Sequence, residues 1–158
     1  MEIQWTRLAV AGCATVAVLA SAWPRDADAE PGWRVGLGRT LFNSWATWGE
    51  VGYEWPGAWE IAASAGNAGN TRNGHQDGVA AASFSRILRP QWHLLGAANY
   101  YRLGVAYVDG SVLVGNSNFR LGIGLEWSAV QLEYFHYSSG GLGKPNTGVD
   151  GLVLRFAY

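Results

Sequence analysis

Hydrophobic and polar residues alternate in short segments along most of the chain after residue 30. Successive side chains of a β-strand point to opposite faces, so this period of two predicts strands with one apolar face. In the clearest segment, five apolar residues oppose two charged residues and two glycines: Phe119, Leu121, Ile123, Leu125 and Trp127 against Arg120, Gly122, Gly124 and Glu126. Eight strands are predicted, at 33–40, 47–55, 58–65, 78–88, 91–108, 118–127 and, as a final pair, between 131 and 158.

The connections between the predicted strands alternate in length. Short turns follow the second, fourth and sixth strands at Pro56-Gly57, Arg89-Pro90 and Ser128-Ala129. Longer polar connections follow the third, fifth and seventh strands, at 66–77, 109–117 and 139–148. Outer-membrane β-barrels have short periplasmic turns and long external loops. The pattern therefore predicts an all-β chain, an eight-stranded antiparallel transmembrane β-barrel of the bacterial outer membrane, with the 139–148 loop outside the cell.

The fifth segment departs from this regularity. It is too long for one strand, and its alternation slips near Tyr100-Tyr101. A β-bulge places one extra residue in a strand and shifts its parity. We therefore expect a bulge at this point.

The two faces of the predicted strands differ in charge. The faces opposite the apolar ones carry Arg34, Glu50, Glu54, Glu60, Arg120, Glu126, Glu133 and Arg155. The interior of an eight-stranded barrel is narrow and filled by side chains, so charges of both signs are expected to pair there. A soluble barrel of the lipocalin or streptavidin kind would instead turn its apolar face inward. The abundant tryptophan and the terminal aromatic Tyr158 favour the membrane.

Length and composition are consistent with this prediction. The chain has 158 residues, room for one domain, with nine tryptophans, seven tyrosines, 22 glycines and a net charge of −1. Proteins that bind nucleic acid need a basic face, so a near-neutral charge excludes that class of partner.

The first 29 residues resemble a secretory signal. Arg7 precedes an apolar run of about 13 residues, too short for the roughly 20 that a transmembrane helix requires. Residues 1–22 are predicted to be removed, with a second candidate cleavage site ending at residue 29, which leaves one barrel domain at 30–158. The only cysteine, Cys13, lies in the apolar run. It would fit a lipoprotein processing box, but the apolar stretch before it is short.

Three polar residues lie at the end of the apolar face of the last strand pair. His136 and Ser138 share the parity of Leu132, and Asp150 shares that of Leu152. A base, a hydroxyl and a carboxylate are the groups of a serine ester hydrolase. If the hairpin loop is symmetric, Asp150 lies across the ladder from His136. The alternative is a histidine that only extends towards the membrane surface.

The surrounding residues resemble a family signature. The stretches are His136-Tyr137-Ser138, Gly140-Gly141-Leu142, Lys144-Pro145-Asn146, Gly148 and Asp150, with 119–127 before them. They are similar to the carboxy-terminal part of the outer-membrane lipid A 3-O-deacylase family (PagL-type). The resemblance implies an ester hydrolase that removes the 3-position acyl chain of lipid A, with Ser138 as nucleophile, His136 as general base and Asp150 as the orienting acid. It also implies lipopolysaccharide and outer-membrane lipids as partners and a site at the external leaflet.

The chain departs from the family pattern at two positions. Ser139 stands where the family usually has the asparagine that assists the oxyanion hole, and Asp150 stands where it usually has glutamate. The Ser139 hydroxyl and backbone N–H groups near Gly140 and Gly141 could share the oxyanion role. Asn146 matches a family position, although an asparagine after a proline is equally typical of a turn.

These departures leave two other functions open. One is a non-enzymatic outer-membrane barrel with a decayed site, and the other is an esterase for phospholipid. The sequence contains no ligand spacing typical of a metal site and no phosphate-binding glycine loop, so no metal or other cofactor is expected. It does not decide whether the chain forms a homodimer.

Overall fold

The computed structural model describes residues 31–41, 45–71, 74–110, 113, 115–140 and 148–158. The predicted signal segment lies outside these residues. The strands are β1 (Gly32–Leu41), β2 (Thr47–Trp55), β3 (Trp59–Gly66), β4 (Gly69–Thr71), β5 (Gly74–Gln76), β6 (Val79–Leu88), β7 (His93–Leu94), β8 (Ala97–Asp109), β9 (Ser117–Trp127), β10 (Val130–Ser138) and β11 (Val149–Ala157). None of the described residues forms a helix long and apolar enough to cross a membrane.

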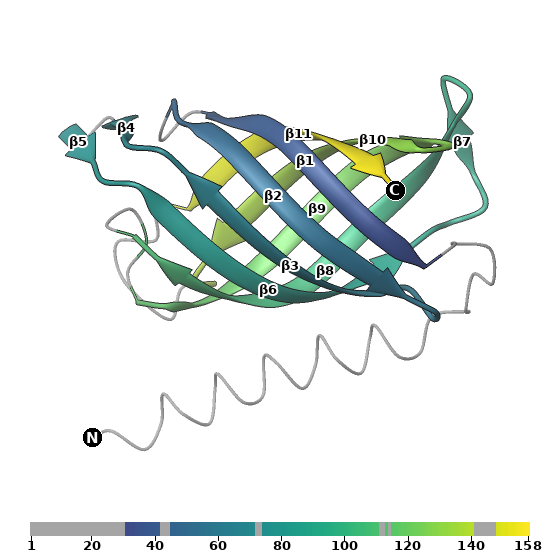
Figure 1. Cartoon of the computed structure of the whole chain (residues 1–158), viewed down its shortest axis with the longest axis horizontal. Helices are drawn as coiled ribbons and strands as arrows, with labels where there is room; N and C mark the ends of the chain where they lie inside the picture. The colour runs from purple at the N-terminus through teal and green to yellow at the C-terminus, as the bar shows by residue number, and fades with distance from the viewer. Residues whose placement is uncertain (1–30, 42–44, 72–73, 111–112, 114, 141–147) are drawn as a thin grey trace, which may run out of the picture.

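Eight of the strands form a closed antiparallel barrel. Their order is β6-β3-β2-β1-β11-β10-β9-β8, and β6 pairs with β8 to close the ring. Figure 1 shows these strands tilted around a common axis, with the β4–β5 hairpin and β7 at opposite ends. The barrel predicted from the sequence is confirmed, and β2 has the predicted bounds.

The predicted bulge is wrong. Register is continuous on both sides of β8, where Tyr101 faces Ile123 on β9 and Leu88 on β6. The surplus length forms a separate hairpin instead, because β7 pairs with the start of β8 through Leu95 and Gly96. Both of these turn residues have positive φ, 54° and 75°, as two-residue hairpin turns of type I′ require.

The parity slip has a local cause at the start of β8. Asn99 and Tyr100 are both buried, although successive residues of a strand should face opposite ways. The Asn99 amide donates a hydrogen bond of 2.9 Å to the Trp92 carbonyl oxygen, which folds its side chain onto the β7 hairpin. Asn99 is thus buried by this hairpin, and only Tyr100 enters the barrel interior.

Charged side chains fill the barrel interior near the middle of the strands. All the predicted inward residues except Glu126 are buried, and Arg102 joins them. The side chain of Glu126, near the end of β9, is 15% exposed. Glu133 accepts hydrogen bonds of 3.0 Å from Arg102 and 3.3 Å from Arg120. Arg155 lies 2.7 Å from Glu60 and 2.9 Å from Glu50. Because each buried charge faces opposite charges, the desolvation cost of placing it inside is offset.

An apolar cluster fills the interior beneath the end of β10. Phe135 and Tyr137 point inward and pack against Trp48, with ring centroids 5.0 and 5.9 Å apart. The Tyr137 hydroxyl lies 3.3 Å from the hydroxyl of Ser64 on β3. These inward anchors alternate with Tyr134, His136 and Ser138, so they fix the stretch of β10 that carries the candidate site.

The outward face is mostly apolar, with the exposed Arg39 on β1 as a charged exception. Leu37 is 68% exposed and Phe156 is 48% exposed. Near the β2–β3 turn, edge-to-face contacts join Trp33 to Tyr53 and Tyr53 to Trp55. This arrangement is the reverse of a lipocalin-like soluble barrel, and it fits an apolar band with an aromatic girdle.

Candidate active site

The β10–β11 ladder brings His136 and Asp150 together. They are directly opposite each other in the register, and His136 Nδ1 lies 2.7 Å from Asp150 Oδ1. The ring can donate its Nδ1–H to this carboxylate, which leaves the lone pair of Nε2 to accept a proton. The contact therefore has the form that holds a histidine base in one tautomer.

Both side chains belong to the outward face. They share the parity of Leu132 and Leu152, which are 39% and 41% exposed. The side chain of His136 is 32% exposed and that of Asp150 is 14% exposed. The pair is therefore partly accessible on the outer surface of the barrel, between apolar neighbours.

Ser138 lies at the end of β10 and is less accessible. It has the parity of His136, pairs with Phe119 on β9 and is 7% exposed. Between these described residues, no hydrogen bond joins the Ser138 hydroxyl to His136. Nucleophile–base contacts are often long in the absence of substrate and tighten when substrate binds.

Tyr134 joins this pair, although no role was predicted for it from the sequence. Its hydroxyl donates a hydrogen bond of 2.5 Å to Asp150 Oδ1. Tyr134 pairs with Leu152, so it reaches Asp150 diagonally across the ladder. The available signal was its position two residues before His136 on the same face.

The predicted oxyanion residues are only partly described. Ser139 is 2% exposed, and Gly140 has a positive φ of 61°, which turns the chain after β10. Gly141 and Asn146 lie outside the described residues. The oxyanion role of this group stays a prediction.

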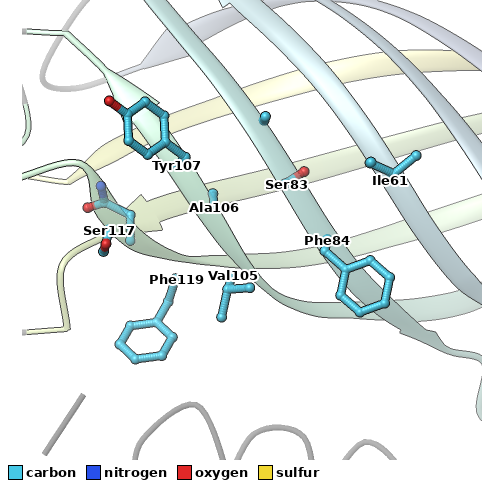
Figure 2. A pocket seen from close by; sticks show the side chains of 10 residues that line it. Ile61, Ser83, Phe84, Val105, Ala106, Tyr107, Ser117 and Phe119 are labelled. Carbon is cyan, nitrogen blue, oxygen red and sulfur yellow. The ribbon is translucent and has the colours of Figure 1, made fainter. Parts of the chain in front are cut away.

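A shallow groove on the outer surface begins at the strand next to Ser138. It has a volume of about 430 Å³, and its lining includes Phe119, Val105, Phe84 and Ile61. The register aligns these residues in one row from β9 through β8 and β6 to β3. Figure 2 shows the row on the outside of the barrel wall. From Phe119 on β9 to Ile61 on β3 the row spans three strand spacings, roughly 14 Å.

Gly148 packs against the imidazole ring at the start of β11. Its φ is +61°, and a Cβ atom there would lie 2.8 Å from His136 Cε1. Gly148→Ala should therefore displace the ring, and we expect about a 10²-fold loss of kcat/KM for ester hydrolysis. Gly115→Ala is the matched control, because Gly115 also has a positive φ but its Cβ would meet open space. Equal rates for the two variants would contradict the prediction.

Comparison with known proteins identifies the family. The family described as "Lipid A 3-O-deacylase (PagL)" matches residues 31–158. The chain belongs to the PagL family. It is therefore a carboxylic ester hydrolase.

A solved structure shares the fold of this PagL family member. It is titled "Crystal structure of the outer membrane enzyme PagL", is 19% identical, and aligns with a TM-score of 0.56. The alignment covers 80% of this chain and 99% of that chain. No curated protein matches this chain.

Proposed function

We propose that this chain hydrolyses the ester bond of the 3-position acyl chain of lipid A, with Ser138, His136 and Asp150 as its catalytic group. The contact between His136 and Asp150 on the outward face of a PagL-family barrel carries the proposal. A base held there meets a substrate whose ester bonds lie at the membrane surface.

The proposed reaction has two steps. Ser138 Oγ attacks the acyl carbonyl carbon while His136 Nε2 takes its proton, and the oxyanion is stabilised by N–H donors near Ser139 and Gly140. The tetrahedral intermediate then collapses, the C–O bond to the sugar breaks, and His136 returns the proton to the leaving oxygen. A water molecule next attacks the acyl-enzyme through the same base and releases the fatty acid and Ser138.

The groove beside Ser138 supports an acyl chain as the substrate group. Its apolar row continues from Phe119 to Ile61. Counted from Ser138, which pairs with Phe119 on β9, the row extends over four strand spacings, roughly 19 Å. A fatty acyl chain cleaved at Ser138 can thus lie along the barrel wall with its apolar length covered.

The proposed site faces the external leaflet. β10 ends and β11 begins at the end of the barrel opposite the short β2–β3 and β9–β10 turns. In outer-membrane barrels the short turns face the periplasm. This arrangement supports a position of His136 and Ser138 at the leaflet that contains lipopolysaccharide.

Mass spectrometry of lipid A from cells that express the chain tests the proposal. We expect wild-type lipid A to lose one acyl chain from the 3-position, and lipid A from Ser138→Ala cells to keep it. Loss of the chain in both cases, or in neither, would contradict the assignment. Accumulation of lysophospholipid with intact lipid A would instead identify a phospholipid esterase.

A further inference from the structure

Two donors converge on one oxygen of Asp150. Oδ1 lies 2.7 Å from His136 Nδ1 and accepts the 2.5 Å hydrogen bond from the Tyr134 hydroxyl. The three side chains come from two strands and form a chain from phenol to carboxylate to imidazole. The phenol therefore contacts the same atom that orients the proposed base.

The surroundings make this hydrogen bond strong. Leu152 lies opposite Tyr134 on β11, and Ile123 lies opposite it on β9. Both of these neighbours are apolar, so neither offers Asp150 a competing hydrogen bond. A hydrogen bond to an ionised acceptor is about twice as strong as one between neutral groups, and a low local dielectric strengthens it further.

The phenol also compensates for the short acid. Aspartate has one methylene fewer than the glutamate that the family pattern usually has, so its carboxylate has a shorter reach towards the imidazole. Direct cross-strand pairing brings Asp150 close to His136, and the carboxylate can still rotate about its side-chain bonds. A second bond to Oδ1 removes this freedom.

We propose that Tyr134 is a positioning residue that holds Asp150 Oδ1 against His136 Nδ1. This role rests on the proposed hydrolysis by Ser138, His136 and Asp150. Tyr134 acts through the carboxylate, so its removal should slow the chemical step and leave substrate binding unchanged.

The test is Tyr134→Phe, which removes the hydroxyl and keeps the ring. With purified enzyme and lipid A in detergent micelles, we expect kcat to fall about 10- to 100-fold with KM unchanged. Tyr101→Phe is the matched control. Tyr101 faces outward in the same row, since Tyr101 and Tyr134 both pair with Ile123 from opposite sides. It should retain the wild-type kcat.

A double-mutant cycle separates positioning from general support of the fold. In an Asp150→Ala background, Tyr134→Phe should cause no further loss, because the phenol no longer has a carboxylate to hold. The same loss in both backgrounds would overturn the role, and so would a wild-type kcat in Tyr134→Phe. A wild-type enzyme that releases no acyl chain would overturn the proposed function and this role with it.

Discussion

Replacing His136 by asparagine should lower kcat for ester hydrolysis by at least about 10⁴-fold. Asparagine retains a polar group on the outward face but has no lone pair basic enough to take the proton of Ser138. Asp150 would then orient a group that cannot act as a base. The rate should be measured on purified protein with lipid A in micelles, by the fatty acid released.

His93→Asn is the control for this experiment. His93 is exposed on β7, at the end of the barrel opposite to the one where β10 ends, and the same substitution there removes an imidazole without touching the proposed site. We expect its kcat to equal that of the wild type. A His136→Asn enzyme that retains more than a hundredth of wild-type activity would show that another group takes the proton.

Replacing Glu133 by glutamine should lower the free energy of unfolding by about 3–5 kcal/mol. Glu133 is fully buried and accepts hydrogen bonds from Arg102, Arg120 and Tyr100. Glutamine has nearly the same shape but no charge, so these buried guanidinium groups would lose a counter-charge that water cannot replace. Arg155, 3.7 Å away, would lose part of its compensation as well.

Urea titration of the folded barrel in lipid vesicles measures this loss, and the heat-modified gel mobility of the barrel reports the folded fraction. Asp109→Asn is the control, because Asp109 is exposed at the end of β8. Its effect should lie within about 0.5 kcal/mol of zero. A Glu133→Gln barrel with an unchanged unfolding midpoint would show that the remaining carboxylates suffice for the cluster.

The barrel could be predicted from the sequence because the two faces of its strands lie in different environments. Lipid outside requires apolar residues, and the narrow interior accepts charges only in pairs, so residues such as Leu154 and Arg155 alternate clearly. The prediction of inward charges was confirmed on this basis. This prediction needed only the alternation of apolar and polar residues, which can be read directly from the sequence.

The prediction was wrong where a local contact overrode parity. Asn99 is a polar residue that is buried by its hydrogen bond to Trp92. It interrupts the alternation of apolar and polar residues in the sequence, so Arg102 was not among the residues predicted to lie inside the barrel. The turn at Leu95 and Gly96 was also missed, because leucine is an uncommon residue at positive φ. Such contacts depend on side-chain conformations that a period of two does not encode.

The candidate site was predictable as a face but not as a set of distances. Parity placed His136, Ser138 and Asp150 on one side, and a symmetric loop was enough to place Asp150 opposite His136. The bond from Tyr134 and the burial of Ser138 follow from rotamers and from the turn after β10. Their catalytic roles stay predictions until activity is measured.

The closure of the ring links assembly to chemistry. β11 pairs with β10 on one side and with β1 on the other, so the ring closes through strands at opposite ends of the described sequence. Before that strand docks, β1 and β10 are open edges that can recruit other chains. Asp150 arrives on this same strand. In the proposed mechanism, ester hydrolysis therefore requires that β11 has docked beside β10, because only then does Asp150 contact His136.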